Sequence, residues 1–535
     1  MDASDGTRPV SRSSYSNGSE EPLIGKVNDE GGFQYPRLSK IRSVLIIASL
    51  AGTNLSSSMS HGLITVGIPY IASDLLLPDH LLLWPSSVAA TENLSNKYLS
   101  HSLASGCCLL IAGALADLVG DRLINIIGTI LLAISAFGSA MATSGFSMIG
   151  FRLVEGIGVS MCLPTGVSVI TRSFPPGRRR NVGFGCLGLS QPLGFSLGMA
   201  LEGVFATAPN GWRYGFYFCA GIGLGFAVSS ILTLPKDYER PNFHWRRVLY
   251  DIDWIGALVA SACLGIISYI CAVLTEDISN LYQVKQIVLI LIAMILIPVF
   301  VFWMDFQETR GKPVLIPNSL WSNTAFVAIS IVVFMTWGVL QGSELFLSLF
   351  FQKIQHLSPL ETSVNLLPNI FIGIVLNVTT GLIVHAIRVN YLIVLTATLA
   401  AVSPLLMAFV DPKWNYWTCA FWAVLLGPVS VDVVFTVAHL LITDIFAPST
   451  HALAGAVFNT IAQLGTSVGL CVIAVVSAAV QHSSNYPKDS PDALMSGYRA
   501  AFWTCFAMMV TTVIICSVGL RNIRKLGATT TENWS

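Results

Sequence analysis

Charged side chains are scarce in this sequence, and their scarcity limits what the protein can be. Only 11% of the 535 residues are Asp, Glu, Lys or Arg, while 53% are hydrophobic, and the mean hydropathy is +0.69. A soluble domain carries roughly a quarter charged residues, so this composition indicates a protein that crosses a lipid bilayer many times. The formal net charge is zero, so nothing points to a nucleic-acid partner.

Signals of secretion and of catalysis are also missing. Residues 1–42 are polar and lack the apolar core of a cleavable signal peptide, so we expect the apolar run from Ile41 to direct insertion. The sequence has no P-loop, which argues against an ATP-driven pump. Cys107 and Cys108 do not have metal-ligand spacing, and all 11 cysteines fall in apolar runs, as packing residues do. We therefore expect no enzyme activity, no metal and no cofactor.

Long apolar runs are what the sequence has in abundance. A helix crosses about 30 Å of hydrocarbon with about 20 apolar residues, and an open sheet cannot satisfy its backbone polar groups in lipid. The pattern therefore predicts an all-α polytopic membrane protein with about fourteen transmembrane helices. The predicted spans are 43–66, 102–117, 123–142, 146–171, 182–206, 213–234, 254–274, 285–304, 323–350, 361–385, 389–410, 415–441, 451–480 and 500–520.

The positions of Lys and Arg predict the orientation and the division of the chain. With a cytoplasmic N-terminus, the inner segments hold about three times as many basic residues as the outer ones, which favours an even number of spans. Inner segments at 235–253 and 305–322 then group the spans as six, two and six, as in a two-bundle transporter. The predicted regions are a disordered cytoplasmic tail (1–42), an N-terminal six-helix bundle (43–234), a linker with two extra helices (235–322), a C-terminal six-helix bundle (323–520) and a cytoplasmic tail (521–535).

The segment "GALADLVGDR", 113–122, lies between the second and third predicted spans. It resembles the signature of the major facilitator superfamily in that loop. Gly113, Asp117, Gly120 and Arg122 match, while two positions that are usually basic in the family hold other residues here. Glycines let helix ends approach closely, and an aspartate can cap a neighbouring helix N-terminus or pair with a basic residue. The resemblance implies a gating latch, whereas the motif alone is compatible with a simple turn.

The segment "RLVEGIG", 152–158, places two charges in an apolar run. The spacing i, i+3 predicts that Arg152 and Glu155 share one helix face, and the cost of charge in a bilayer predicts that this face points into a central cavity. The segment resembles the fourth-helix motif of the superfamily, whose arginine serves proton coupling. The alternative is a fixed ion pair that only holds helices together.

The segment "GLSQPLGFSLG", 188–198, resembles the superfamily's antiporter motif, a glycine-rich fifth helix bent at a proline. Gly188, Pro192, Gly194 and Gly198 carry the match, and Gln191 departs from it. Small residues at this spacing pack helices tightly, and the proline bends the helix. The resemblance implies export, while tight helix packing alone is the other reading.

Three further segments resemble the fourteen-span drug:proton antiporter branch found in fungi: "DWIGALVASA" (253–262), "SPLETSVNLLPNIFIGIV" (358–375) and "HALAGAVFNTIAQLGTSVGL" (451–470). The resemblance implies a major facilitator fold of two six-helix bundles plus two extra central helices. It also implies a monomer in the plasma membrane, or alternatively the vacuolar membrane, that exchanges protons for a small-molecule substrate such as a drug, toxin or secondary metabolite.

Proton coupling needs a carboxylate in the membrane, and this chain lacks a common one. Many members of the branch have an aspartate nine residues before a proline in the first helix, where this chain has Ser60. Intramembrane ionisable residues mark functional sites, so Glu155, Glu344 and Asp432, the last with His439, become the candidates. His439 and His61 are also compatible with hydrogen-bonded structural roles, and Glu344 with a solvated loop start.

We expect the substrate cavity between the first, fourth, seventh and tenth helices of the two bundles. The residues predicted to line it are His61, Gln191, Pro192, Trp337, Gln341, Glu344, Asn365 and Gln463. Their mixture of aromatic and polar groups suits a small organic molecule of mixed polarity. Uptake or flux of a small inorganic or nitrogenous solute by the same fold, and a sensor that moves nothing, are the alternatives.

A polar stretch, "SSVAATENLSNKYLSHSLASG" (86–106), interrupts the second predicted span. It is either an extended outer loop or an intron wrongly retained in the predicted gene, and the shortness of the run 102–117 favours the second interpretation. If it is a loop, Asn93 in "NLS" is a glycosylation acceptor on the outer face.

Overall fold

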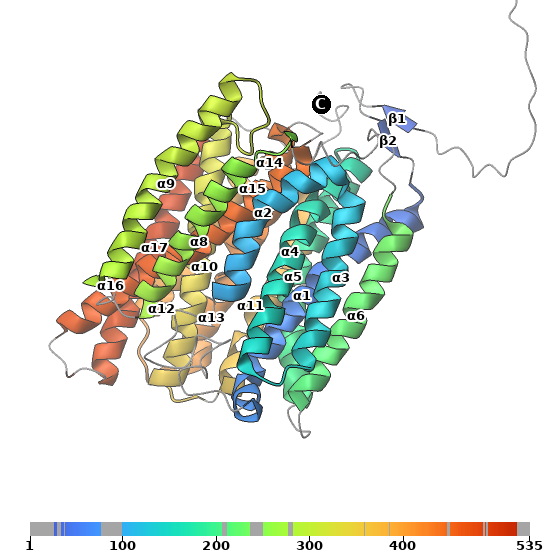
Figure 1. Ribbon diagram of the computed structural model, residues 1–535. Coiled ribbons are helices and arrows are strands. Elements are labelled where there is room, and N and C mark those ends of the chain that lie inside the picture. Colours follow the sequence, from blue (N-terminus) through green and yellow to red (C-terminus); the bar gives the residue numbers. More distant parts are fainter. Residues whose placement is uncertain are drawn as a thin grey trace, which may run out of the picture.

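The computed structural model describes residues 26–28, 34–36, 38–75, 99–205, 211–235, 250–276, 282–357, 359–384, 386–446, 450–484, 487 and 490–521. Over these residues the chain is almost entirely helical, and the helices run side by side through one bundle (Figure 1). The prediction of an all-helical protein is confirmed.

Six helices make up the first part of the bundle. They are α1 (Lys40–Asp74), α2 (Leu99–Val119), α3 (Asp121–Ala140), α4 (Gly145–Ser173), α5 (Arg178–Phe205) and α6 (Gly211–Thr233). Proline side chains lie inside α4 and α5, at Pro164 and Pro192.

Two helices follow, and then the second part of the bundle. These two are α8 (Trp254–Glu276) and α9 (Val284–Thr309). The second part comprises α10 (Thr324–Leu349), α11 (Pro359–Ile383), α12 (Val389–Ala408), α13 (Ala420–Leu426), α14 (Val429–Ile445), α15 (His451–Leu464), α16 (Leu470–Ser483) and α17 (Pro491–Gly519). Short π-helical turns, Phe350–Ile354 and Gly465–Gly469, extend α10 and join α15 to α16.

Each of the predicted spans coincides with a helix or with two consecutive helices. Within the described residues, 12 helices are long and apolar enough to cross a membrane, and α1 and α2 accompany them in the bundle. One expectation is wrong: the second span is not short. It begins at Leu99, and its 21 residues extend about 31 Å at the helical rise, so residues 99–101 belong to the helix.

A small antiparallel ribbon lies in the N-terminal region that was predicted to be disordered. Its strands are β1 (Lys26–Asn28) and β2 (Gln34–Pro36), with Val27 opposite Tyr35. The rest of the predicted tail up to Arg37 lies outside the described residues.

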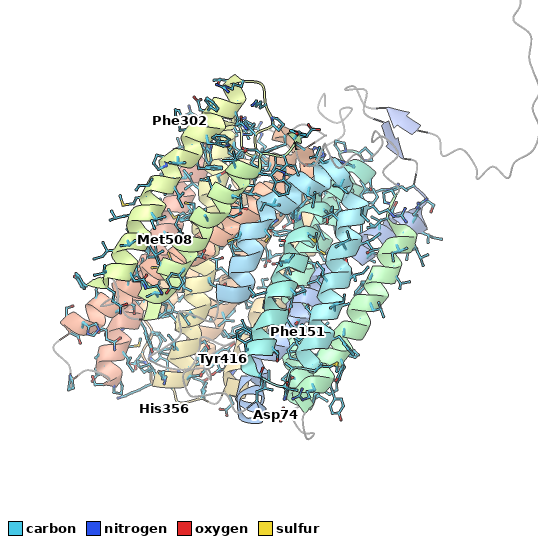
Figure 2. All side chains as sticks on the ribbon, viewed as in Figure 1. Asp74, Phe151, Phe302, His356, Tyr416 and Met508 are labelled. Atoms are coloured by element: carbon cyan, nitrogen blue, oxygen red, sulfur yellow. The ribbon has the colours of Figure 1, made fainter. Side chains whose placement is uncertain are left out.

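The outside of the bundle is apolar, as a lipid-facing surface requires. Helix α9 shows this most clearly, because only Gln286, Ala293 and Met304 are buried along its length. Phe302, which is 71% exposed, projects from its outer side (Figure 2). Helix α9 packs on α8, which in turn contacts α2 and α16.

The two parts of the bundle meet through α5 against α11 and through α2 and α4 against α15. We call the end of the bundle that holds the α2–α3 turn and the start of α15 the inner end, following the predicted orientation. A continuous buried apolar cluster joins both parts and includes Ile46 of α1, Phe184 of α5, Phe326 of α10 and Phe458 of α15. Asp74, His356 and Tyr416 lie at the opposite, outer end (Figure 2).

Candidate functional site

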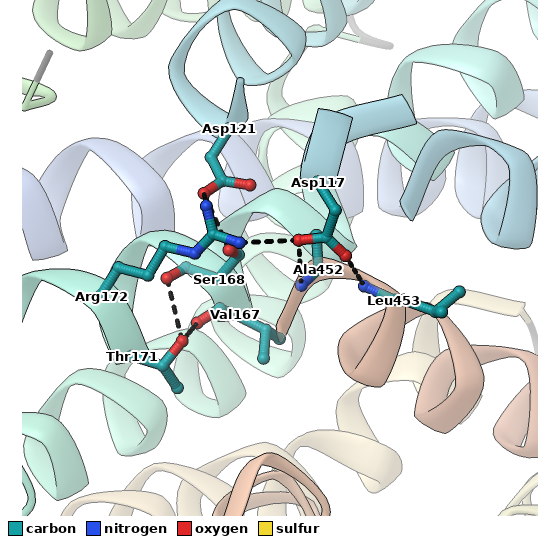
Figure 3. A network of polar contacts seen from close by, with 8 residues as sticks. All are labelled: Asp117, Asp121, Val167, Ser168, Thr171, Arg172, Ala452 and Leu453. Atoms are coloured by element: carbon teal, nitrogen blue, oxygen red, sulfur yellow. Dashed lines mark hydrogen bonds and ion pairs between the residues drawn. The ribbon is translucent and has the colours of Figure 1, made fainter. Parts of the chain in front are cut away.

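At the inner end, Asp117 joins the two parts of the bundle. It lies in the last turn of α2, and its carboxylate accepts hydrogen bonds from the backbone N–H groups at the start of α15 (Figure 3). The Oδ1 atom accepts from Ala452 N at 3.3 Å, and Oδ2 accepts from Leu453 N at 2.9 Å. The first N–H groups of a helix lack intrahelical partners and carry a partial positive charge, so Asp117 caps a helix of the other half.

Arg172, in the last turn of α4, fixes Asp117 in that position. Its Nη2 lies 2.8 Å from Asp117 Oδ1, and its Nη1 lies 3.1 Å from Asp121 Oδ2. Asp121, the first residue of α3, also accepts a hydrogen bond from Ser168 Oγ at 2.8 Å. One guanidinium therefore ties α2, α3 and α4 together beside the cap on α15 (Figure 3).

Glycines allow this close approach. A Cβ atom on Gly113 would lie 2.6 Å from Ala456 Cβ, so α2 and α15 can cross here only because Gly113 has no side chain. Gly120 has φ +133°, a conformation that favours glycine, and forms the tight turn between α2 and α3. Arg122 turns away from the cap and donates to the carbonyl of Ile231 in α6.

A second polar centre lies inside α4, nearer the outer end. Arg152 Nη1 and Glu155 Oε2 are 2.7 Å apart, with side chains only 4% and 2% exposed. Arg152 Nη2 donates to Ser60 Oγ of α1 at 3.0 Å, and the guanidinium lies 5.2 Å from the Phe216 ring of α6. The predicted shared face is therefore real, and it points into the protein toward α1 and α6. His61 lies within electrostatic range of both charges.

A third polar centre lies in the second half of the chain, where α11 and α14 face α5. Asn377 Nδ2 of α11 donates to Asp432 Oδ1 of α14 at 2.8 Å and to Gly373 O at 2.9 Å. A Cβ atom on Gly373 would lie 3.0 Å from Asp432 Oδ2 and 3.7 Å from Pro192 of α5. Gly373 therefore has both Asp432 of α14 and Pro192 of α5 as neighbours, at the boundary between the two halves.

Glu344 lies within α10 and is held by α11. Its Oε1 accepts a hydrogen bond from Asn369 Nδ2 at 3.0 Å, and the residue is only half-buried. Since α10 continues to Leu349 and then into a π-helical turn, Glu344 is not a solvated loop start. Asp432 lies within its electrostatic range.

An aromatic cluster occupies the middle of the second half, at the boundary with the first. The His439 ring centroid lies 3.9 Å from that of Phe458, 4.5 Å from that of Phe435 and 5.5 Å from that of Phe184 in α5. Trp337 of α10 packs edge-on against Phe458 at 5.5 Å. The His439 Nδ1 atom is 2.8 Å from the carbonyl oxygen of Phe435, so His439 has the hydrogen bond that a structural histidine requires.

A small cavity opens beside this cluster, between α1, α4, α5, α14 and α15. Its polar lining residues are Asn54, His439 and Asn459, and Phe435 is its aromatic wall. Asn54 itself donates to Ser190 Oγ at 2.9 Å and to the Leu187 carbonyl at 3.2 Å. Apolar side chains and Gly166 complete the lining: Leu50, Cys162, Leu163, Val167 and Leu187.

The remaining residues predicted for the cavity do not line it. Gln341 is exposed on α10, and Gln191 and Gln463 are half-buried. The backbone carbonyl of Asn365 accepts a hydrogen bond from the Tyr416 hydroxyl at 2.6 Å. Asn93 lies outside the described residues.

Sequence reasoning missed Asn377 and the pairing of Arg172. The only signal for Asn377 is an amide inside an apolar run, and Arg172 looked like one more inner basic residue. Both bond to residues distant in the sequence, with separations of 55 positions to Asp432 and to Asp117 respectively.

Comparison with known families settles the class of the molecule. The family model described as the Major Facilitator Superfamily matches residues 50–470. The chain belongs to the Major Facilitator Superfamily. The superfamily consists of membrane transporters, so the chain is a multi-pass transporter and not an enzyme, and its predicted major facilitator fold is confirmed.

Similar proteins of known family are also named as transporters, and their names differ in the solute or in the direction of transport. MFS-type transporter 1 of Pyricularia oryzae is 36% identical, and the match covers 96% of this chain and 88% of the relative. Efflux pump terJ of Aspergillus terreus is 25% identical over 78% of each chain. The low affinity ammonium transporter of Saccharomyces cerevisiae is 23% identical over 76% of each chain.

Solved structures share the fold. The human organic anion transporter MFSD10 (TETRAN) superposes with a TM-score of 0.61 at 14% identity, covering 89% of this chain and 99% of that one. The proton:xylose symporter XylE superposes with a TM-score of 0.59 at 14% identity, covering 93% and 100%. At such identities the likeness concerns the fold alone.

Proposed function

We propose that this transporter belongs to the fourteen-span drug:proton antiporter branch and exports a small organic molecule in exchange for protons. The observation that carries the proposal is the buried Arg152–Glu155 pair, which is hydrogen-bonded to Ser60. Charges are rarely kept inside a membrane protein without a function. The pair lies where a proton reaching Glu155 would release Arg152 and so alter the contact between α4 and α1.

Alternating access requires contacts between the halves that form and break. The Asp117 cap on α15 and the glycine contacts of α2 and α5 with the second half supply such contacts at the inner end. We infer that Gly113, Asp117 and Gly120 act as a latch that is closed in this conformation and opens to admit substrate from the cytoplasm. Arg122 supports the latch by holding α3 against α6.

The cavity beside His439 has a volume of about 20 Å³, room for roughly one water molecule, so we propose that it widens in another conformation to hold a ligand of mixed polarity. Amide and imidazole groups from Asn54, His439 and Asn459 can orient a polar group, while Phe435 and aliphatic side chains contact an apolar body. We propose Trp337 and Pro192 as neighbours of the path and Asp432, with Glu344, as a second candidate for proton coupling. We propose that five further residues line the substrate cavity in other conformations of the transport cycle: His61, Gln191, Gln341, Asn365 and Gln463.

The membrane in which the protein resides is proposed from its resemblance to the fungal antiporter branch. We propose a monomer in the plasma membrane, with the vacuolar membrane as the alternative, glycosylated at Asn93 on the outer face. The division into two six-helix bundles, a linker with two extra helices and two cytoplasmic tails is part of the same proposal. The relative named as an efflux pump supports export.

Transport into inside-out vesicles tests the proposal. Vesicles containing the full chain receive an imposed proton gradient, acidic inside, and a panel of radiolabelled apolar–polar toxins. We expect accumulation that collapses when a protonophore is added. Accumulation that ignores the gradient would rule out proton coupling, and accumulation in whole cells instead of vesicles would rule out export.

A second candidate function is flux of a small nitrogenous solute, which the relative named as an ammonium transporter favours. Uptake of labelled methylammonium by whole cells that express the chain would support it. Ligand binding to the purified protein without flux of either class of solute would instead favour a sensor.

A further inference from the structure

Glu202 is a buried carboxylate that plays no part in the centres described above. It lies one turn from the outer end of α5, and its relative exposure is 0%. Neither carboxylate oxygen has a hydrogen-bond partner among the described residues. Within the described chain it is also in no ion pair with a cation, in contrast to Glu155 and Asp117.

Three helices enclose this carboxyl group. A Cβ atom on Gly67 of α1 would lie 2.7 Å from Glu202 Oε1, and one on Gly215 of α6 would lie 3.3 Å from Oε2. Both neighbours are glycines, so the space that holds the carboxyl group exists because two side chains are missing. The Leu63 side chain of α1 also approaches Gly215, which places apolar atoms beside the group.

The arginines toward the outer ends of α4 and α6 already form ion pairs with other carboxylates. On α1 and α6, Asp74 Oδ2 lies 2.9 Å from Arg213 Nη2. On α4, Arg152 is paired with Glu155 at 2.7 Å. Cys219 of α6 lies within electrostatic range of Glu202 and of that pair. The described arginines near Glu202 are thus paired with other carboxylates, and His61 of α1 lies within electrostatic range of the Arg152–Glu155 pair.

An isolated carboxylate is strongly disfavoured in an apolar interior, and such a group takes up a proton instead. We propose that Glu202 is a proton-binding site of the transporter, enclosed between α1, α5 and α6 and loaded from the outer end. When the outer ends of α1 and α6 separate from α5, the carboxylate takes one proton from water. The helices can then close on the neutral acid, and the proton returns to water only when they part again.

This inference rests on the proposed proton-coupled function and adds a site to it. It also explains Gly67 and Gly215, since a side chain at either position would fill the space of the carboxyl group. A neutral acid that never exchanges its proton is the alternative, and it predicts no response to pH.

The first test detects the proton directly and does not need transport. The full chain in lipid vesicles is titrated while infrared spectra record the carbonyl stretch of protonated carboxyl groups. Many carboxyl groups contribute to this band, so the comparison is made by difference. We expect one pH-dependent component of the wild-type band to be lost in Glu202→Gln and retained in Glu361→Gln, a control at an exposed glutamate at the outer end of α11. A titrating band that persists unchanged in Glu202→Gln would overturn the proposal, as would a wild type without one.

The second test measures coupling in the same vesicles. Because glutamine has the shape of the protonated acid, Glu202→Gln should reach the membrane in normal amounts, and its accumulation should fall to the level seen without a proton gradient. Glu202→Asp, which can still titrate, should retain part of the gradient dependence and shift the pH midpoint of accumulation. If the Gln variant fails to fold, the Asp variant alone tests the proposal. Normal gradient dependence in both variants would overturn the proposal. Loss of the infrared band without any proton-driven transport in the wild type would retain Glu202 as a proton site and reject the proposed antiport.

Discussion

At the scale of the residue, the interior charges differ in how they are balanced. Arg152 and Glu155 balance each other and are joined to α1 through Ser60. Among the described residues, Asp432 has only a neutral amide donor, Asn377, and Glu202 has no donor. A balanced pair tolerates burial, while an unbalanced acid is stable there only in its neutral form. The carboxyl groups of Glu155, Asp432 and Glu202 would therefore bind a proton in surroundings of very different polarity.

Removing Arg152 should strongly reduce transport without preventing insertion into the membrane. Breaking a buried pair from one side costs on the order of 3–5 kcal/mol, because the remaining charge is left unpaired. We expect Arg152→Ala to reduce efflux at least about tenfold, equivalent to ~1.4 kcal/mol in the barrier. Surface abundance and efflux are measured together, with Arg179→Ala, a change at an exposed inner-end arginine, as the control.

Two further variants of the pair sharpen this prediction. Arg152→Lys should rescue only partly, since lysine lacks the planar set of donors that reaches Glu155 and Ser60 at once. The double variant Arg152→Ala/Glu155→Gln should regain thermal stability but not efflux. Efflux at the normal rate with normal abundance in Arg152→Ala would rule out a role in transport.

At the scale of the element, the start of α15 depends on a residue of α2. Asp117 accepts from two N–H groups of α15, and charge at a helix N-terminus contributes about 0.3–1 kcal/mol, or up to ~2 kcal/mol when partly buried. The same carboxylate is held by Arg172. The cap therefore favours the conformation in which the inner ends of α2, α4 and α15 are in contact.

Asp117→Asn should slow the change between conformations and leave ligand binding largely intact. The amide oxygen can still accept one N–H bond, but the charge that attracts Arg172 and the helix end is lost. We expect turnover to fall several-fold with little change in the affinity for the exported compound. Asp251→Asn, the same change at an exposed position before α8, is the control, and a normal turnover in Asp117→Asn would contradict a latch.

At the scale of the whole molecule, the two halves meet closely at glycines. A Cβ atom on Gly188 of α5 would overlap Asn377 Oδ1 of α11, and one on Gly185 would lie 2.6 Å from the Asn377 carbonyl. A Cβ atom on Gly381 of α11 would in turn lie 3.1 Å from the Asn181 carbonyl oxygen of α5. The halves can close at the inner end only because these positions add no volume.

Gly188→Val should hold the halves apart at the inner end. The added methyl groups collide with Asn377, so the closed conformation becomes costly while the conformation open to the cytoplasm remains accessible. We expect export to fall at least about tenfold, while ligand still binds to inside-out vesicles. Gly221→Val is a matched control, because nothing lies within 4 Å of a Cβ atom at Gly221 of α6. Equal export by both variants would show that closure at Gly188 is not required.

The features that could be predicted are those that depend on local sequence pattern, such as run length and residue spacing. Apolar runs of the right length became helices, and the i, i+3 spacing of Arg152 and Glu155 became an ion pair. The sequence predicted a latch at Asp117 through a resemblance, but not that the partner would be the backbone of α15. Asn377, Arg172 and Glu202 could not be assigned, since their significance depends on residues from other helices. The second helix was placed too late, because the polar residues at its start were assigned to an insert and not to the helix.

The cap at Asp117 recognises α15 by main-chain atoms alone. As far as this bond is concerned, the side chains at 452 and 453 are free to change during evolution, because any residue with an N–H group can donate. Paired substitutions in α2 and α15 will therefore leave no covariation signal for this contact. Proline is the exception, since it has no N–H group to give. In alignments of homologues, the only trace of this contact between the two halves should be that proline is rare at positions 452 and 453.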